Sequence, residues 1–238
     1  MPTAHDSWAE VYDLAYENTF PGYIDQLTKN TIKVVKKWQP APAKIVDFGA
    51  GTGRLAVPLA NSGYSVTAVD PSSGMLDVLR WKKVSIPVKS VNSTMQSFMT
   101  QEPYDMALCV FTVIIYLLDQ TGLENALEAG SKAVKPDGFF LIDVPSRAIF
   151  SGLQIEKPGF RRISRIEAVD NDLYRYSDDI ELERNGETKI YSDNFMIRYW
   201  HSDKIKTLLQ KFGMVLIEEL KRDFLGSGSN YYLFRKIT

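Results

Sequence analysis

The sequence predicts an α/β protein with a Rossmann-like doubly wound sheet, mostly parallel, with an antiparallel terminal strand and a small antiparallel β insertion. The first observation behind this prediction is the run from Ile45 to Gly53, in which an apolar strand leads into a glycine turn. The second is a further strand, from Val66 to Asp70, that ends in an acid. The third is the regular alternation of strands and helices from residue 44 to residue 144. Such alternation predicts parallel strands with right-handed crossovers and a ligand site at their carboxyl ends.

The spacing of apolar residues assigns the individual elements of the core. Strands are expected near residues 44–48, 65–69, 86–91, 104–110 and 138–144, with helices near 53–61, 73–82 and 121–134. Pro58 lies inside the first of these helices, and because an internal proline removes a backbone hydrogen bond, we expect a kink there. A last helix from Ser202 to about Phe212 and a hairpin of strands near 214–220 and 230–236 complete the core.

The chain divides into a helical N-terminal segment, an α/β core and an insertion. Residues 7–38 carry apolar positions at helical spacing, interrupted at Pro21-Gly22, which predicts two helices in an N-terminal cap over residues 1–40. Residues 41–148 and 201–238 form the expected core. From residue 160 to residue 200 the apolar period changes to two, which predicts an antiparallel insertion over residues 149–200.

The aromatic residues of the insertion suggest that it covers a ligand. We expect its strands to place these side chains near the position of a roof over the cleft, namely Tyr174, Tyr176, Tyr191, Phe195, Tyr199 and Trp200. A roof favours a small, enclosed ligand. The alternative is that these aromatics form the core of a small sheet or a contact between two copies of the chain, which leaves a homodimer open.

Composition and charge narrow the classes of protein. The chain has 238 residues, 45% of them hydrophobic and 24% charged, which fits one large α/β domain or a domain with an insertion. The formal net charge of -1 lacks the excess of positive charge that is typical of proteins that bind a long nucleic acid, so we expect no DNA partner and disfavour RNA. The single cysteine, Cys109, excludes a disulfide within the chain.

Other features exclude further classes. The first residues lack a basic segment followed by an apolar one, and no apolar stretch is long enough to span a bilayer, so we expect a cytoplasmic protein without membrane contact. His5 and His201 lack the spacing of a metal pair, and we expect no metal. The lack of a GxSxG motif removes the nucleophile of a hydrolase.

The glycine turn indicates which kind of nucleoside ligand the site takes. Glycines allow φ > 0 and close approach of the backbone to a ligand, and an acid such as Asp70 can accept hydrogen bonds from both ribose hydroxyls. The turn has the spacing GxGxG, not the GxGxxG of dinucleotide sites, and no lysine follows it as in a P-loop. Asp47 stands two residues before the first glycine, where a carboxylate repels a phosphate and suits a ligand that bears an ammonium and a sulfonium.

The run from Asp47 to Gly53 resembles the DxGxGxG motif of the class I S-adenosylmethionine (SAM)-dependent methyltransferases. Tyr104-Asp105 and the turn from Val134 to Gly138 are similar to two later landmarks of that family, and the resemblance covers residues 8–145 and 200–236. It is nearest in pattern to small-molecule N-methyltransferases of the amino-sugar or glycine type. The resemblance implies SAM as the cofactor and S-adenosylhomocysteine as the product. It assigns cofactor contacts to Tyr12, Asp47, Gly49, Ala50, Gly51, Gly53, Asp70, Pro71, Met75, Thr94, Met95 and Phe111.

The chain departs from that family after the third strand. Many relatives place an acid there that accepts a hydrogen bond from the adenine amino group, but the stretch from Ser90 to Phe98 contains none. Thr94 aligns with that acid, so its hydroxyl or a backbone carbonyl has to substitute for the carboxylate. In the alternative interpretation Thr94 is only a helix cap.

Methyl transfer from a sulfonium needs little covalent help, because the donor is already activated and positioning and desolvation supply most of the rate. Two tyrosines are catalytic candidates. Tyr116 lies in a segment similar to that of small-molecule N-methyltransferases, and Tyr12 lies in an N-terminal helix that folds over the cofactor in such enzymes. Each is also consistent with a plain core aromatic.

The function that the sequence favours is SAM-dependent methylation of a small molecule, at nitrogen rather than at oxygen. One alternative is the methylation of a macromolecule, either a protein or a tRNA. The other is a SAM-binding module without transferase activity, which the lack of an acid near Thr94 motivates.

Replacement of Asp70 by alanine tests the ribose assignment. The carboxylate is expected to accept buried, charge-assisted hydrogen bonds worth about 1.5 to 3 kcal/mol each, so Asp70→Ala should nearly abolish SAM binding. Isothermal titration calorimetry measures the affinity, and an unchanged affinity would refute the assignment.

Overall fold

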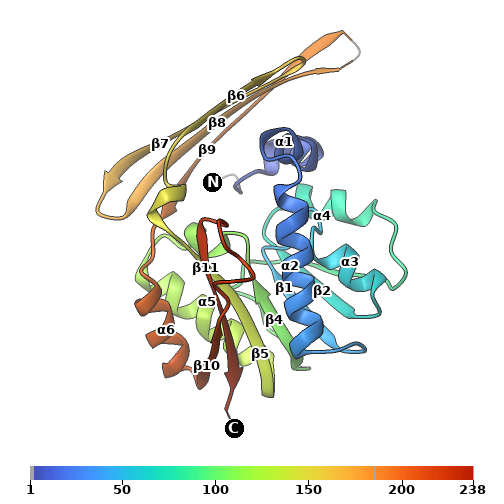
Figure 1. The fold of residues 1–238 in the computed structure, drawn as a ribbon, viewed down its shortest axis with the longest axis vertical. Coiled ribbons are helices and arrows are strands. Elements are labelled where there is room, and N and C mark those ends of the chain that lie inside the picture. Colours follow the sequence, from blue (N-terminus) through green and yellow to red (C-terminus); the bar gives the residue numbers. More distant parts are fainter. Residues whose placement is uncertain (1–2, 185, 238) are drawn as a thin grey trace.

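The central feature of the structure is a seven-stranded sheet with the order β10-β11-β5-β4-β1-β2-β3 (Figure 1). The computed structural model describes residues 3–184 and 186–237. The strands are β1 (Lys44–Phe48), β2 (Ser65–Asp70), β3 (Lys89–Asn92), β4 (Tyr104–Cys109), β5 (Val134–Pro145), β10 (Met214–Glu219) and β11 (Ser229–Lys236). Strand β11 runs antiparallel to both of its neighbours, and the other neighbouring strands are parallel. The predicted doubly wound sheet with an antiparallel terminal strand is confirmed.

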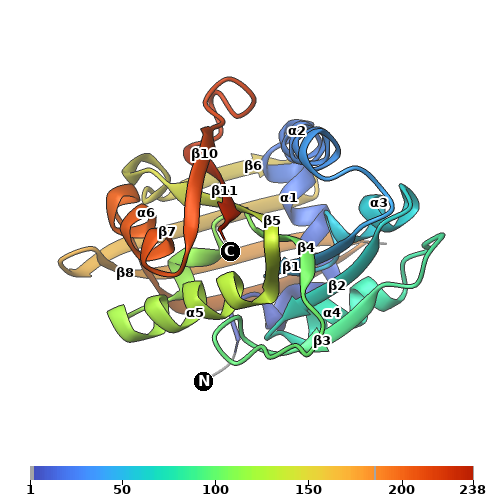
Figure 2. The same cartoon turned by 90° about the horizontal axis from the view of Figure 1, so that it is seen from below.

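Helices cover both faces of this sheet. They are α2 (Tyr23–Trp38), α3 (Ala56–Asn61), α4 (Ser73–Arg80), α5 (Gln120–Ala133) and α6 (Ser202–Lys211). Figure 2 shows α5 and α6 on one side of the strands and α2 and α3 on the other. Because side chains alternate along a strand, Ile45 of β1 packs in one buried cluster with residues of α2, α3 and α4, whereas its neighbour Val46 packs with residues of α5 and α6. The sheet is thus a rigid base for the loops at its carboxyl edge.

Two elements differ in detail from the prediction. Helix α3 begins at Ala56, so Pro58 lies in its first turn, where the missing N–H has no helical partner to lose. The expected kink at Pro58 is therefore wrong, and the helix starts late instead. Strand β3 begins at Lys89 and is shorter than the expected strand at 86–91.

The N-terminal segment forms a short 3-10 helix, η1 (Asp6–Val11), followed by α1 (Tyr12–Thr19) and α2. Gly22, with a φ of 71°, precedes α2, which confirms the predicted break at Pro21-Gly22. Figure 1 shows α1 between the main sheet and a second sheet. The N-terminal helices therefore separate the two sheets.

The second sheet has the order β6-β7-β8-β9 (Figure 1). Its strands are β6 (Leu153–Lys157), β7 (Phe160–Asp170), β8 (Leu173–Arg184) and β9 (Glu187–Arg198). All of its neighbouring strands are antiparallel, so the predicted antiparallel insertion is confirmed. Phe160, Ile180 and Leu182 pack against Trp8 and Ala15 of the N-terminal segment in a small core of their own.

A buried ion pair lies within this second sheet, and its arginine also contacts α1. Arg162 of β7 and Asp178 of β8 are each 1% exposed, and Nη2 of the arginine lies 2.7 Å from Oδ2 of the aspartate. The guanidinium also donates to Thr19 Oγ1 of α1 at 3.1 Å and lies over the rings of Trp8 and Tyr16. Because these groups are desolvated, removal of one partner leaves an uncompensated charge in the interior.

Replacement of Asp178 by alanine should therefore destabilise the protein by about 3 to 5 kcal/mol, because Arg162 stays buried without its partner. The matched control is Asp179→Ala on the same strand, because that carboxylate is half exposed, pairs with Arg165 and contributes about 0 to 1 kcal/mol. Chemical denaturation of both variants measures the difference. Equal losses of stability would contradict the role of the buried pair.

Candidate active site

The glycine turn after β1 has a backbone conformation that favours glycine. Gly49, Gly51 and Gly53 have φ values of 66, 54 and 89°, all in the left-handed region. A Cβ at Gly49 would also lie 2.4 Å from Cγ2 of Val113, in the loop after β4. A Cβ at Gly51 would meet nothing within 4 Å, so this glycine faces open space. The GxGxG spacing thus packs the turn against the β4 loop and leaves its backbone open to a ligand.

Two buried carboxylates lie beside this turn. Asp47 is 3% exposed, and burial raises its pKa to about 7, against the opposing effect of the nearby Arg54 guanidinium. Asp70 Oδ2 accepts the N–H of Gly51 and Oδ1 accepts that of Ser72, both at 2.8 Å. Burial raises the pKa of Asp70 as well, although these two N–H donors oppose the shift. Desolvated negative charge therefore gathers where the sequence predicts a positively charged ligand.

A cavity of about 520 Å³ lies along the turn and is named here the glycine-loop cavity. The predicted cofactor contacts that line it are Tyr12, Asp47, Gly49, Ala50, Gly51, Gly53 and Phe111. Arg54 also lines it, with Nη1 3.0 Å from Thr28 Oγ1 and its guanidinium 4.7 Å from the centre of the Phe111 ring. The cavity thus offers a carboxylate, an open backbone and a cation, a set that fits a zwitterion with an additional positive charge.

Other predicted contacts, all among the described residues, do not line this cavity: Asp70, Pro71, Met75, Thr94 and Met95. The N-terminal segment lies against the start of α4, close to the end of β2. Asp6 Oδ1 there accepts hydrogen bonds from the hydroxyl of Ser72 and from the N–H of Gly74, the latter at 3.1 Å. Helix η1 therefore packs on the part of the sheet edge that Asp70 belongs to.

Thr94 and Met95 follow β3 but have different surroundings. Thr94 Oγ1 accepts the N–H of Ser97 at 3.3 Å, so its hydroxyl closes the turn at residues 95–97, which is not a helix. Met95 is 6% exposed, and its Cε lies against Gly130 of α5. The Met95 side chain therefore belongs to the core, and its predicted cofactor contact is left to the backbone alone.

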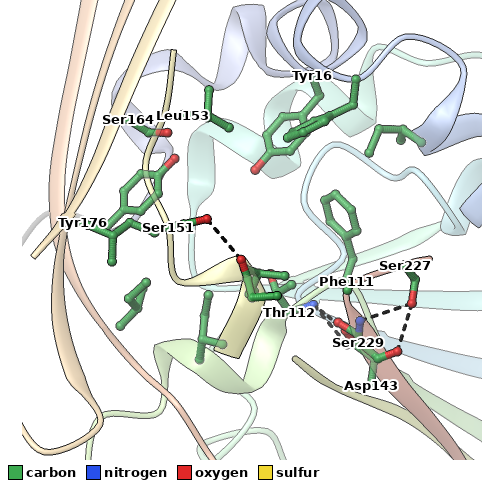
Figure 3. Close-up of a pocket in the computed structure, with 18 of the residues that line it drawn as sticks. Tyr16, Phe111, Thr112, Asp143, Ser151, Leu153, Ser164, Tyr176, Ser227 and Ser229 are labelled. Atoms are coloured by element: carbon green, nitrogen blue, oxygen red, sulfur yellow. Dashed lines mark hydrogen bonds between the residues drawn. The ribbon is translucent and has the colours of Figure 1, made fainter. Parts of the chain in front are cut away.

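A second cavity, of about 570 Å³, lies between the core, the N-terminal helices and the second sheet, and is named here the roof cavity (Figure 3). Tyr16, Ile24 and Phe111 line both cavities, and we refer to these three residues as the shared wall. The rings of Tyr16 and Phe111 lie 5.7 Å apart, centre to centre. Figure 3 shows Tyr176 on the second sheet, across the cavity from these two rings. Ligands in the two cavities would meet at the shared wall.

The loop after β4 has two consecutive residues in the left-handed region, Phe111 with a φ of 73° and Thr112 with a φ of 68°. Such conformations cost about 1 to 3 kcal/mol each and concentrate at functional sites. The fully buried Asp143 of β5 holds the loop, because its Oδ1 accepts the N–H of Thr112 at 3.0 Å (Figure 3). Burial raises the pKa of Asp143 to about 6.

The two candidate tyrosines lie in different cavities. Tyr12 lines the glycine-loop cavity and stacks on Trp8, with ring centres 5.2 Å apart. Tyr116 lines the roof cavity, and its hydroxyl lies 2.8 Å from Nε2 of His5. Neither residue is a plain core aromatic, because each contributes to the wall of a cavity.

The insertion places only part of its aromatic residues in the roof cavity. Tyr176 and Phe195, which are paired across β8 and β9, line it and stack on each other with ring centres 4.8 Å apart. Tyr174, Tyr191, Tyr199 and Trp200 are not among its lining residues, although the structure describes all four. Trp200, for example, is buried in the core and donates its Nε1–H to the carbonyl of Leu117.

The lining residues that the sequence analysis does not predict include His5, Tyr16, Arg54 and Asp143. Tyr16 follows Tyr12 by four residues on the same helix, and this spacing was a usable signal. Arg54 directly follows the last glycine of the turn. His5 and Asp143 reach the roof cavity through contacts between distant segments, for which the sequence carries no local sign.

Within residues 3–184 and 186–237, no group of three or more histidine, cysteine, aspartate or glutamate side chains is arranged to hold a metal ion. No helix in the same ranges is long and apolar enough to cross a bilayer.

The fold and the site together define a class of protein. A glycine loop with buried acids at the carboxyl edge of a doubly wound sheet, together with an antiparallel terminal strand, resembles the architecture of class I SAM-dependent methyltransferases. The lining residues fit SAM, since Asp47 can face its positive charges and Arg54 can face its carboxylate.

Comparison with known proteins supports this class. Residues 45–138 match the family model of a methyltransferase domain. A dTDP-3-amino-3,6-dideoxy-alpha-D-glucopyranose N,N-dimethyltransferase of Streptomyces fradiae is 27% identical over 135 residues, which cover 57% of this chain and 52% of that protein. The chain spans about half the length of the curated relatives it matches. Residues 45–138 of the chain are thus similar to a methyltransferase domain.

Solved structures have the same fold. A SAM-dependent methyltransferase from Clostridium acetobutylicum ATCC 824 has a TM-score of 0.84 at 14% identity, covering 96% of this chain and 99% of that one. SAM-bound CalS10, an amino pentose methyltransferase from Micromonospora echinaspora, has a TM-score of 0.75 at 18% identity, covering 95% and 96% of the two chains. At these identities the likeness establishes the fold alone.

The raised pKa of Asp47, about 7, makes SAM binding dependent on pH. Below pH 7 the Asp47 carboxyl of the free protein is mostly protonated. The positively charged SAM binds better to the ionised carboxylate of Asp47. The affinity for SAM should therefore increase as the pH rises through 7, by at most about tenfold per pH unit, and decrease as the pH falls.

Calorimetric titrations at constant ionic strength measure this dependence, and Asp47→Asn provides the control because it removes the titrating group. The variant should bind SAM more weakly, with a flatter pH profile. Identical profiles for the two proteins would show that Asp47 does not face the donor.

Proposed function

We propose that this protein transfers a methyl group from SAM to the nitrogen of a small-molecule amine. The observation that carries the proposal is the shared wall, where Tyr16, Ile24 and Phe111 line both the glycine-loop cavity and the roof cavity. The donor lies in the first cavity and the acceptor in the second. Transfer then takes place across the wall, between the rings of Tyr16 and Phe111.

The division of the chain matches this arrangement. In the proposal, residues 1–40 form a cap over the cofactor, residues 41–148 and 201–238 form the SAM-binding core, and residues 149–200 form a roof over the acceptor. The support is that His5, α1 and the second sheet supply walls of the roof cavity that the main sheet lacks, including Tyr16, Tyr176 and Phe195.

The cofactor contacts follow from charge and burial. Asp47 lies beside the ammonium and sulfonium groups, and Arg54 pairs with the carboxylate of the methionine part. Asp70 binds the ribose hydroxyls, with Pro71, Met75, Thr94 and Met95 around the adenine. Asp6 of η1 lies beside this end of the proposed adenosine site, where it accepts hydrogen bonds from Ser72 and Gly74 at the start of α4.

The chain's own residues have a modest chemical task. SAM, when bound, supplies an activated methyl group on a positively charged sulfur. The residues of the two cavities exclude water, align the acceptor nitrogen with the methyl carbon and leave a path for the proton that the product nitrogen loses to solvent. Tyr116 and Tyr12 act in this way, Tyr116 on the acceptor and Tyr12 on the donor.

The ionisable groups of the roof cavity favour nitrogen over oxygen. An alcohol needs a strong base before it attacks, whereas a neutral amine attacks as it is. Among the described lining residues, burial lowers the pKa of His5 to about 3 and Asp143 has a pKa of about 6. Neither group is basic enough to deprotonate an alcohol, so an amine suits this cavity better.

The alternatives have less support. A protein or tRNA acceptor fits poorly, because the roof cavity lies beneath the second sheet and the N-terminal helices. Only a measurement of turnover distinguishes a SAM-binding module without transferase activity from an active methyltransferase. Three expectations stay predictions: a cytoplasmic location, the lack of nucleic-acid partners and a homodimer.

Turnover with a panel of small acceptors tests the function. We expect the purified protein to convert SAM to S-adenosylhomocysteine with primary or secondary amines, but not with matched alcohols or carboxylic acids, as followed by mass spectrometry of the methylated product. Replacement of Ile24 in the shared wall by tryptophan should reduce kcat/KM by roughly 100-fold, because the wider side chain separates the reactants. Tight SAM binding without turnover of any amine would favour the binding module, and methylated oxygen would overturn the assignment to nitrogen.

A further inference from the structure

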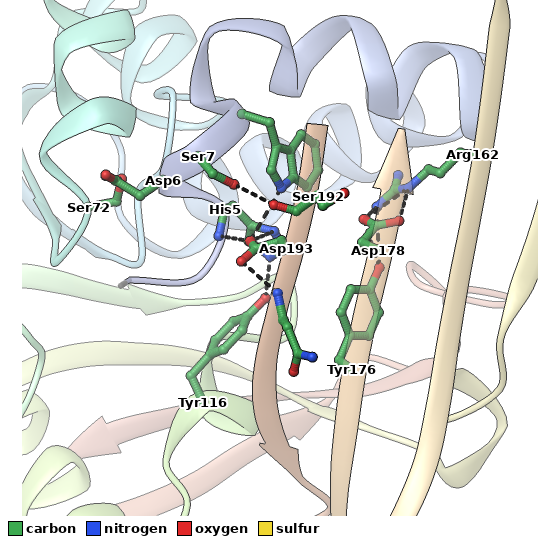
Figure 4. A network of polar contacts seen from close by, with 12 residues as sticks. His5, Asp6, Ser7, Ser72, Tyr116, Arg162, Tyr176, Asp178, Ser192 and Asp193 are labelled. Carbon is green, nitrogen blue, oxygen red and sulfur yellow. Dashed lines mark hydrogen bonds and ion pairs between the residues drawn. The ribbon is translucent and has the colours of Figure 1, made fainter. Parts of the chain in front are cut away.

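His5 lies at a place that the methyl-transfer chemistry described above does not use. It is 8% exposed, has a φ of 65° and lines the roof cavity just before η1. Its backbone N–H donates to Asp193 Oδ2 of β9 at 2.6 Å, and the indole N–H of Trp8 donates to the same oxygen at 3.3 Å (Figure 4). The second sheet therefore fixes the position of this histidine, although it stands almost at the start of the described chain.

The imidazole of His5 lies between Tyr116 and the second sheet. Its Nε2 lies 2.8 Å from the hydroxyl of Tyr116, as Figure 4 shows. Its Nδ1 is buried without a hydrogen-bond partner, 3.8 Å from Asp193 Oδ2. The rings of Trp8, Tyr12, Tyr116 and Phe195 lie between 5.0 and 5.9 Å from the imidazole, centre to centre. Aromatic packing thus leaves the imidazole little freedom to turn.

The surroundings select one protonation state of this ring. Burial and the charge of Arg162 lower the pKa of His5 to about 3, so the imidazole is neutral near pH 7 and carries one N–H. If Nε2 carried the proton, the lone pair of Nδ1 would face the carboxylate of Asp193. With the proton on Nδ1, the N–H dipole points toward that carboxylate and Nε2 is left as an acceptor.

The ionisable groups around His5 come from every neighbouring element. Tyr12 and Tyr16 of α1 lie on one side, Tyr116 on another, and Arg162, Asp178, Tyr176 and Asp193 belong to the second sheet. Arg162 is paired with Asp178, so Asp193 is the anion nearest to the imidazole. These groups orient the imidazole ring of His5 and leave it neutral near pH 7.

We propose that His5 is a positioning residue that accepts the phenolic proton of Tyr116 and so turns the Tyr116 oxygen into a hydrogen-bond acceptor for the substrate. A hydroxyl whose proton is committed to His5 presents only lone pairs to the roof cavity. The acceptor molecule then has to offer an N–H to Tyr116, which makes it a primary or secondary amine. The N–H bond directed at Tyr116 leaves the nitrogen lone pair free for the methyl carbon.

This inference rests on the proposed function, and the reaction stays balanced without a base. The C–S bond of the sulfonium breaks, the N–C bond forms with the nitrogen lone pair, and the methylated ammonium loses its proton to solvent on release. His5 neither gains nor loses a proton in the cycle. Its contribution is to the orientation of the amine, and it therefore affects turnover more than SAM binding.

A pair of matched variants tests the hydrogen bond. His5→Gln retains an acceptor of similar reach, whereas His5→Met has a similar length without a strong acceptor. We expect His5→Met and Tyr116→Phe each to lower kcat/KM for the amine by roughly tenfold to a hundredfold, and His5→Gln to keep most of the activity. The double variant His5→Met/Tyr116→Phe should be no worse than the poorer single variant, because both remove one interaction.

Further readouts separate positioning from a general structural role. The Kd for SAM should stay within about twofold of the parent in every variant, because the interaction is made only with the acceptor. Additive losses in the double variant, or an equal loss in His5→Gln and His5→Met, would overturn the proposal. So would an ionisation near pH 6.5 in the kcat/KM profile that disappears in His5→Met, because His5 would then act as a base.

The tautomer of His5 can be measured without turnover from the ring nitrogen signals in ¹⁵N NMR spectra of the wild-type protein. We expect the neutral tautomer with the proton on Nδ1 at pH 7. The tautomer with the proton on Nε2, or an imidazolium, would overturn the role of His5 even if amines are methylated. If the expected tautomer is found but no amine is methylated, the proposed function fails and the hydrogen-bond assignment stands.

Discussion

The loop that follows β4 holds the two cavities in contact, and the rest of the site depends on its conformation. Phe111 and Thr112 adopt a left-handed backbone that side chains disfavour, and the Asp143 carboxylate holds them there through the Thr112 N–H. On the other side, Val113 fits against Gly49 only because that residue has no Cβ. The ring of Phe111 thereby reaches the shared wall. Packing and one buried hydrogen bond thus fix the wall that the two cavities share.

Electrostatics gives the two cavities different characters. The glycine-loop cavity has the Asp47 carboxyl and the Arg54 guanidinium on its walls, with Asp70 close by, which suits a ligand that carries charges of both signs. In the roof cavity the charged groups are paired with other protein groups, as Arg162 is with Asp178. Its remaining walls are largely aromatic and aliphatic. These surroundings match the charged donor and the neutral amine of the proposed function.

The sequence predicts most of the fold because its signals are local. The glycine turn, the acid at the end of β2 and the period of two in the insertion each depend on neighbouring residues, and all of them appear as expected. The predicted kink at Pro58 is wrong because α3 starts about one turn later than the apolar pattern indicates. The start of a helix depends on the backbone conformation of the few residues before it, which the apolar pattern does not determine. The cavities could be predicted only in part. Met95, for example, follows β3 as predicted, but its side chain packs against Gly130 of α5, and the sequence does not show which way a side chain of this turn points.

Long-range contacts account for the rest of what the sequence did not reveal. His5 meets Tyr116 across 111 residues, and Asp6 meets Ser72 across 66. Pairings of this kind depend on how the N-terminal segment docks on the core and on the second sheet, which no local pattern encodes. The same holds for the register of β8 and β9, which brings Tyr176 and Phe195 into the roof cavity and leaves Tyr174 outside it.

A crystal structure of the protein with bound SAM tests the central claim most directly. The account predicts that the methionine part lies along Gly49, Gly51 and Arg54, with its methyl group directed between Tyr16 and Phe111 into the roof cavity. A donor that lies in the roof cavity itself, or whose methyl group points away from the shared wall, would contradict it.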